Sequence, residues 1–117
     1  MTRIRLALVA AVAVAALGLA AVAQASTTLT GTVGPGFTIT LKQGGKKVTS
    51  LKAGTYTFKI ADKSNIHNFH LTGPGVNKTT SVGGTGSSTW TIKLKAGTYK
   101  YLCDPHKTIM KGSFKVT

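Results

Sequence analysis

Acidic residues are almost absent from this chain. Its 117 residues include fifteen lysines and arginines but only two acids, Asp62 and Asp104, which gives a formal net charge of +13. The two arginines are Arg3 and Arg5, so residues 26–117 carry thirteen lysines and a net charge of +11, with no arginine and no glutamate. Without arginine, this part lacks the side chain that makes bidentate contacts to bases and phosphates. The composition therefore argues against nucleic acid. It favours protein partners with acidic docking surfaces, or peripheral contact with an anionic membrane or cell envelope.

Long hydrophobic runs are confined to the N-terminus. Two arginines precede an apolar and small-residue run over 6–23, and the run ends in Ala-Gln-Ala at 23–25, the small-x-small pattern that signal peptidase recognises. A transmembrane anchor is the alternative, because a run of this length could nearly span a bilayer. Its alanine content and the cleavage pattern favour a signal peptide. We predict a cleaved signal peptide at 1–25, export to the periplasm or the extracellular cell envelope, and one domain at 26–117.

A helical period is also missing after the signal segment. Apolar residues instead alternate with threonine and lysine, as is typical of strands with one buried face. The strands are expected at 37–42, 55–62, 88–95 and 112–117, with Phe37, Ile39, Leu41, Tyr56, Phe58, Ile60, Trp90, Ile92, Leu94, Phe114 and Val116 on their inner faces. Glycine-rich turns separate them, and together they predict an all-β fold, an antiparallel sandwich or a closed barrel. Most lysines are expected to solubilise outward faces and protect sheet edges.

The hexapeptide Leu-Lys-Ala-Gly-Thr-Tyr occurs twice, at 51–56 and at 94–99, each time followed by a strand. Ala-Gly supplies a turn, and the leucine and tyrosine on either side can cover the core where the chain reverses. We interpret the repeat as one structural corner used twice in a two-sheet fold.

Cys103 is the only cysteine, so no disulfide can form within the chain. In an exported protein a free surface thiol would be oxidised, and burial or metal binding is therefore expected. Alternation places Cys103 on the inner face with Tyr99 and Tyr101, at the end of a strand. His106 and Met110 follow in the next turn, so one loop gathers a thiolate, an imidazole and a thioether. Thiolate and thioether together favour copper over harder metals.

A copper site of this type needs a second imidazole, and the segment NIHNFHL at 65–71 offers two. Alternation places His67 on the face of Phe69 and Leu71, and His70 on the opposite face. We therefore predict that His67 is a ligand and that His70 is an exposed strand residue. Two imidazoles, a thiolate and a weak thioether form the donor set of blue-copper electron-transfer sites.

The segments NIHNFHL and YLCDPHKTIMKGSFKV together resemble the small blue copper proteins, the cupredoxins of the plastocyanin, pseudoazurin and amicyanin group. The resemblance covers most of residues 36–117. It implies a Greek-key β-sandwich of about seven to eight strands with one mononuclear type 1 copper ion at one end. It also implies that His67, Cys103 and His106 are the strong ligands and that Met110 is the weak axial ligand.

The function that this resemblance implies is electron transfer between redox protein partners by a monomer, through Cu(I)/Cu(II), without enzymatic activity. Asn68 would tie the two ligand-bearing loops together, and His106, nearest to solvent, would be the route for electrons. A copper carrier or storage protein with the same ligands remains an alternative, as does an extracellular binding module with an intermolecular disulfide at Cys103. A cysteine-histidine hydrolase is disfavoured because no third orienting group is apparent. A blue-copper oxidase or nitrite reductase is disfavoured because three histidines cannot supply a second copper centre.

Overall fold

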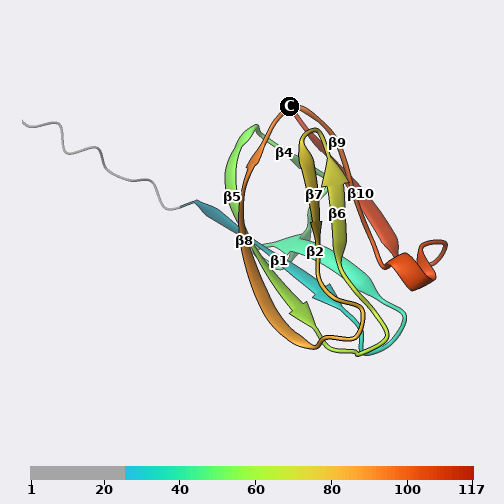
Figure 1. Ribbon diagram of the computed structural model, residues 1–117. Helices are drawn as coiled ribbons and strands as arrows, with labels where there is room; N and C mark the ends of the chain where they lie inside the picture. The colour runs from blue at the N-terminus through green and yellow to red at the C-terminus, as the bar shows by residue number, and fades with distance from the viewer. Residues whose placement is uncertain (1–25) are drawn as a thin grey trace, which may run out of the picture.

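The computed structural model describes residues 26–117, so the predicted signal peptide lies outside the described residues. Ten β-strands and one 3₁₀ turn make up this part of the chain (Figure 1). The elements are β1 (Thr27–Val33), β2 (Ile39–Gln43), β3 (Lys46–Lys47), β4 (Ser50–Leu51), β5 (Gly54–Asp62), β6 (His70–Gly73), β7 (Val76–Thr79), β8 (Gly86–Leu94), β9 (Gly97–Leu102), the 3₁₀ turn η1 (Asp104–His106) and β10 (Lys111–Val116). None of the residues in 26–117 belongs to a helix that is long and apolar enough to cross a membrane. The prediction of an all-β fold is confirmed.

The strands form two five-stranded sheets that lie against each other (Figure 1). One sheet has the order β3-β2-β1-β5-β8, and the other has the order β4-β10-β9-β6-β7. Most neighbours are antiparallel, as expected, but β1 pairs in parallel with β5, and β4 pairs in parallel with β10. The sandwich class is thus confirmed. The two parallel pairs join strands that are distant in sequence, and local alternation carries no signal for them.

The core lies between the sheets and consists of alternate residues of the strands. In β5 the buried apolar residues are Tyr56, Phe58 and Ile60, while the residues between them are partly or fully exposed. Two aromatic stacks cross strand boundaries: Phe69 on Tyr101, with ring centroids 5.4 Å apart, and Tyr99 on Phe114, at 5.3 Å. Each buried side chain of this size contributes about 1.5–3 kcal/mol to folding. This packing fixes the frame on which the end loops rest.

The sequence pattern is wrong for Phe37 and does not predict β1 or β7. Phe37 was expected on the inner face of a strand, but its side chain is 58% exposed and the strand begins only at Ile39. Gly34 has a φ of 72° and is followed by a bend, so the alternation does not extend back to Phe37. In β1, Gly31 interrupts the apolar alternation, and β7 holds a single apolar residue. Ile39 and Trp90 are only partly buried but pack against the core.

Both copies of the hexapeptide carry the chain from one sheet to the other. The first leads from β4 to β5, and the second leads from β8 to β9. In the first, the Tyr56 hydroxyl donates to the Lys52 carbonyl at 2.7 Å. In the second, the Tyr99 hydroxyl donates to the Lys95 carbonyl at 2.9 Å and accepts from the Lys95 amide at 3.0 Å. Each corner is thus closed by a tyrosine that reaches back four residues, as in the tyrosine corners of other sandwiches. The structural interpretation of the repeat is confirmed.

Replacing Tyr99 by phenylalanine removes two hydrogen bonds to Lys95, whereas Tyr56→Phe removes one. We expect Tyr99→Phe to lower the free energy of unfolding by about 1–3 kcal/mol and Tyr56→Phe by about 0.5–1.5 kcal/mol. Urea unfolding followed by the fluorescence of Trp90, the only tryptophan, measures both values. An equal loss in the two variants would contradict the unequal bonding of the two corners.

Candidate metal centre

The two segments that carry the predicted ligands meet at one end of the sandwich. His67 lies in the loop that joins β5 to β6, and Cys103 is the first residue after β9. Strands β6 and β9 are antiparallel neighbours with His70 opposite Leu102. The residues just before β6 and just after β9 must therefore fall at the same end of the sheet. Figure 1 shows η1 and its loop at the end of the sandwich away from the C-terminus.

Three donor atoms form a compact triangle at this end. His67 Nδ1 lies 3.1 Å from His106 Nδ1, and Cys103 Sγ lies 3.7 Å from the first nitrogen and 3.5 Å from the second. A circle through the three atoms has a radius of about 2.0 Å, close to the length of a metal–imidazole bond and slightly shorter than a metal–thiolate bond. One metal ion near the centre of the triangle therefore reaches all three donors. Within residues 26–117, this is the one group of three histidine, cysteine or acidic side chains placed to hold a metal.

The loop after Cys103 is closed by its own backbone. The Cys103 amide donates to the Met110 carbonyl at 3.0 Å, and the Met110 amide donates to the His106 carbonyl at 2.8 Å. The His106 amide donates in turn to the Cys103 carbonyl at 3.0 Å, and Pro105 restricts the first turn of η1. Cys103, His106 and Met110 are thus held by mutual main-chain bonds, and the Met110 side chain is fully buried.

The four predicted ligands differ in their access to solvent. His67, Cys103 and Met110 are completely buried, whereas His106 is partly exposed. Phe37 covers the two imidazoles from outside, with edge-on contacts at centroid distances of 5.3 Å to His67 and 4.9 Å to His106. Phe37, which the sequence pattern placed on the inner face of a strand, therefore lies over the metal centre instead. No local signal identifies it, because its partners are thirty or more positions away.

Gly34 leaves room for the His67 ring. A Cβ at Gly34 would lie 3.2 Å from His67 Cδ2 and 3.0 Å from Ser64 Cβ, so a side chain there would press on the imidazole. His67 Nε2 is buried and has no hydrogen-bond partner among the described residues. Packing, rather than a hydrogen bond at Nε2, therefore sets the ring orientation that points Nδ1 at the other donors.

Asn68 joins the two ligand-bearing segments. Its side-chain nitrogen donates to Asp104 Oδ2 at 2.7 Å, and its side-chain oxygen accepts from the Asp104 amide at 2.8 Å. The same nitrogen donates to Thr79 Oγ1 at 3.0 Å, which adds β7 to the network. Because Asn68 follows His67 and Asp104 follows Cys103, this clip fixes the relative position of the buried imidazole and the thiol.

His70 extends the clip on the outer side. Its Nδ1 lies 2.9 Å from Asp104 Oδ1, and its Nε2 lies 2.6 Å from Asn77 Oδ1. His70 is a strand residue outside the donor triangle, as expected, but the expectation of exposure is wrong in part, because its side chain is only 24% exposed and is bonded at both nitrogens. The signal for this pair is Asp104 itself, one of two acids in a very basic chain, placed directly after the cysteine.

The pair shifts the pKa of both partners. The hydrogen bond to Asp104 raises the pKa of His70 above its ordinary 6.5; burial opposes this, and the bond to Asn77 adds to it. Burial raises the pKa of Asp104, but hydrogen bonds from His70 and Asn68 and the charges of His70 and Lys107 outweigh it. The net result is a pKa below the ordinary 3.8. The imidazolium and the carboxylate therefore stabilise each other.

Fold and site together define a class of protein: a β-sandwich with two imidazoles and one thiolate gathered at one end, the donor set of a type 1 copper centre. A profile of the copper binding proteins of the plastocyanin/azurin family matches residues 37–117. The chain belongs to this family, as its sequence resemblance implied, and its cofactor is a single type 1 copper ion.

Solved structures of rusticyanin share the fold. A methionine-to-glutamine mutant of rusticyanin is 23% identical and has a TM-score of 0.59, over 79% of this chain and 78% of that one. Reduced rusticyanin is 22% identical with a TM-score of 0.57, over 79% of each chain. Rusticyanin from Thiobacillus ferrooxidans is 24% identical with a TM-score of 0.56, over 79% of this chain and 77% of that one. A comparison with curated protein sequences finds no match. The cupredoxin-like sandwich is therefore confirmed. At these sequence identities, the similarity shows a shared fold and nothing more.

We expect the stabilisation from the His70–Asp104 pair to depend on pH. Because the pKa of His70 is raised on folding, its contribution is present below 6.5 and is lost as the pH rises through the raised value. Because the pKa of Asp104 is lowered, its contribution is present above 3.8 and is lost as the pH falls through the lowered value. In the copper-free protein, His70→Gln should lower the free energy of unfolding by about 0.5–1 kcal/mol between these limits and by less at about pH 9.

Lys107→Gln is the matched control, since it removes a positive charge near Asp104 and leaves the His70–Asp104 pair in place. Urea unfolding at several pH values gives both differences. A loss in the His70 variant that is constant from about pH 5 to 9 would count against the ion pair.

Proposed function

We propose that this protein transfers single electrons between redox protein partners through its copper ion. His67 Nδ1, Cys103 Sγ and His106 Nδ1 are the proposed strong ligands, and Met110 is the proposed weak axial ligand. The observation that carries the proposal is the donor triangle, whose sides of 3.1 to 3.7 Å match one trigonally bound ion. Two imidazoles, a thiolate and a weak thioether suit both oxidation states of copper.

The copper supplies the Cu(I)/Cu(II) couple, and the protein keeps its surroundings unchanged between the two states. Main-chain bonds within 103–110 and the Asn68–Asp104 clip hold the donors, so little structure has to move when an electron arrives. Buried Cys103 and Met110 keep water from the inner side of the centre. His106 is the one proposed ligand with exposed surface, and it therefore provides the route for electrons between the centre and a docked partner.

The cellular setting forms part of the same proposal. The N-terminal sequence supports export as a cleaved precursor, to the periplasm or the extracellular cell envelope. The charge of +11 over residues 26–117 supports redox partners with acidic docking surfaces and a monomer that repels its own copies. The proposal does not include an enzymatic reaction.

Burial of Cys103 weighs against a binding module joined by an intermolecular disulfide. The side chain is 0% exposed, and its sulfur faces two imidazoles rather than solvent. A copper carrier or storage protein would use the same ligands, so geometry alone does not separate it from an electron carrier. Reversible electrochemistry with fast self-exchange distinguishes the two, because a carrier has no need of a small reorganisation energy.

The mature protein mixed with Cu(II) should turn intensely blue from thiolate-to-copper charge transfer, and its electron paramagnetic resonance spectrum should show narrow copper hyperfine splitting. Cys103→Ser should abolish the colour, and His67→Ala should alter or abolish it. His70→Ala is the matched control: it removes the neighbouring imidazole and should leave the colour in place. A colourless mixture in which the thiol still titrates would refute the proposed site.

Phe37 should raise the reduction potential by shielding His106 from water, since an apolar cover disfavours the more highly charged Cu(II) state. We expect Phe37→Ala to lower the potential in voltammetry and to leave the blue colour intact. Ile109→Ala is the control, because Ile109 is similarly exposed, at 64%, and lies in the ligand loop. Equal shifts in the two variants would show that general exposure, and not the aromatic cover, sets the potential.

A further inference from the structure

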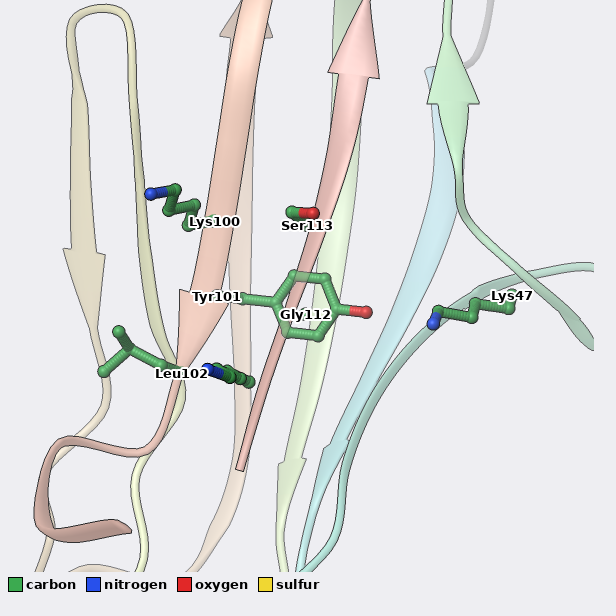
Figure 2. Close-up of a pocket in the computed structure, with 7 residues that line it drawn as sticks. Lys47, Lys100, Tyr101, Leu102, Gly112 and Ser113 are labelled. Atoms are coloured by element: carbon green, nitrogen blue, oxygen red, sulfur yellow. The ribbon is translucent and has the colours of Figure 1, made fainter. Parts of the chain in front are cut away.

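A groove lined by lysines lies beside the metal centre. Its volume is about 520 Å³, and the side chains that matter are Lys47 of β3, Lys100 and Tyr101 of β9, and Lys111 and Ser113 of β10. Figure 2 shows Lys47 and Lys100 on opposite sides of the Tyr101 ring. An adjoining hollow of about 230 Å³ shares Lys47, Tyr101 and Lys111 and adds Lys42.

The groove exists because β10 lacks a neighbour along part of its length. Strand β4 pairs with β10 only at Lys115 and Val116, so within 26–117 residues 111–114 have no strand on that side. Gly112 lets the Tyr101 ring pack directly against β10 and form the floor of the groove, since a Cβ there would lie 2.2 Å from Tyr101 Cζ. A stretch of β10 edge therefore borders a hollow with charged walls.

The positive charge of the groove has no internal partner. The two acids of residues 26–117 are engaged elsewhere: Asp62 is buried at the end of β5, and Asp104 bonds Asn68 and His70. In this part of the chain, the one ion pair joins His70 to Asp104, and no lysine takes part in one. Burial raises the pKa of Tyr101, so its hydroxyl stays neutral and adds no negative charge. The lysines repel one another until an anion arrives from outside.

We propose that this groove is the docking site for an extended acidic segment of a partner protein, whose carboxylates pair with Lys47, Lys100 and Lys111. Lys47 and Lys100 lie on opposite sides of Tyr101 rather than converging on one point, which suits several separate carboxylates better than a single phosphate (Figure 2). Lysine acts as a point charge without the bidentate fork of arginine, so it places no planar demand on its anion. The unpaired edge of β10 offers main-chain groups to an extended segment.

The groove is continuous with two of the proposed ligands. Leu102 in its wall precedes Cys103, and Lys111 follows Met110. An acidic segment docked there lies beside the copper and favours the oxidised ion, which carries one more positive charge. By linkage, the partner binds the oxidised protein more tightly and is released more readily after reduction. The identity of the occupant as a redox partner rests on the proposed function, whereas the anion-binding groove rests on the lysines alone.

A hexaglutamate peptide is the probe for this groove. Titrated into the ¹⁵N-labelled Cu(I) protein at low ionic strength, it should shift the amide signals of Lys47 and of residues 111–113. The triple variant Lys47→Gln/Lys100→Gln/Lys111→Gln should bind the peptide about tenfold more weakly, as expected for three exposed ion pairs. Confinement of the shifts to other strands would overturn the proposal.

The matched control is Lys59→Gln/Lys93→Gln/Lys95→Gln. These three lysines are exposed on and beside β5 and β8, and their removal costs the same net charge. We expect a loss of only about two- to threefold in this variant, from the weaker long-range attraction. Equal losses in the two triple variants would show non-specific attraction and overturn the proposal. Because the peptide binding is measured without reference to colour or redox activity, this result stands or falls separately from the proposed function.

Two further measurements test the nature of the docked partner and its coupling to the oxidation state of the copper. Binding of the protein to phosphatidylglycerol vesicles is measured for both triple variants. If only the groove variant binds the vesicles more weakly, while the peptide binds both variants equally, the occupant is a lipid surface and the proposal is wrong. The peptide should bind the Cu(II) protein about two- to fivefold more tightly than the Cu(I) protein. It should therefore lower the reduction potential by the amount that corresponds to this ratio of affinities, at 59 mV for each factor of ten. Equal affinity of the peptide for the Cu(I) and Cu(II) proteins would overturn the proposed coupling between docking and the oxidation state of the copper.

Discussion

The pairing of β6 with β9 is the constraint on which the metal centre depends. It sets the segment that leads into β6 beside the segment that leaves β9, and it thereby brings together donor atoms that are thirty-six positions apart in the chain. Phe69, the residue before β6, stacks on Tyr101 of β9 and stabilises this pairing on the inner side. A slip of one residue in this register would turn His67 away from the core and place the thiol opposite the wrong neighbour. The copper site is therefore a property of the sandwich as much as of its loops.

The Asn68–Asp104 clip transmits that register to the donors. Its two hydrogen bonds, at 2.7 and 2.8 Å, span the gap between the loop of His67 and the loop of Cys103. Bringing two imidazoles and a thiol to within 3.7 Å restricts their side chains, and buried packing around them has to offset that loss of freedom. In the proposed electron transfer, donors held in this way need little rearrangement when copper changes its charge. Because the donors are held from the inner side, we expect a change at the outer cover Phe37 to alter the electrostatics of the centre without disturbing its geometry.

Much of the centre could be predicted from sequence because its logic is local. Alternation predicts inward-facing side chains for His67 and Cys103, both of which are buried, and the spacing of Cys103, His106 and Met110 places these three in one loop. The contacts that sequence did not reveal all join distant segments. Phe37 contacts histidines that are thirty or more positions away in the chain. The parallel strands β1 and β5 are not joined by a hairpin turn, so no turn motif in the sequence indicates their pairing. The groove could not be predicted for a different reason. The thirteen lysines look alike in the sequence, and those that line the groove differ only in lying beside the part of β10 that has no neighbouring strand.

The order of copper binding and folding follows from where the donors lie. Cys103, His106 and Met110 occupy eight consecutive positions, so the chain can gather them at small entropic cost before either sheet exists. We expect His67 to join them only when β6 has paired with β9, because no short loop connects it to the others. An unfolded chain can therefore capture the ion with an incomplete set, and the last imidazole converts that loose complex into the native centre. This affinity of the unfolded chain reduces the stability that the metal adds to the folded state, while it lets the chain bind its cofactor early in folding.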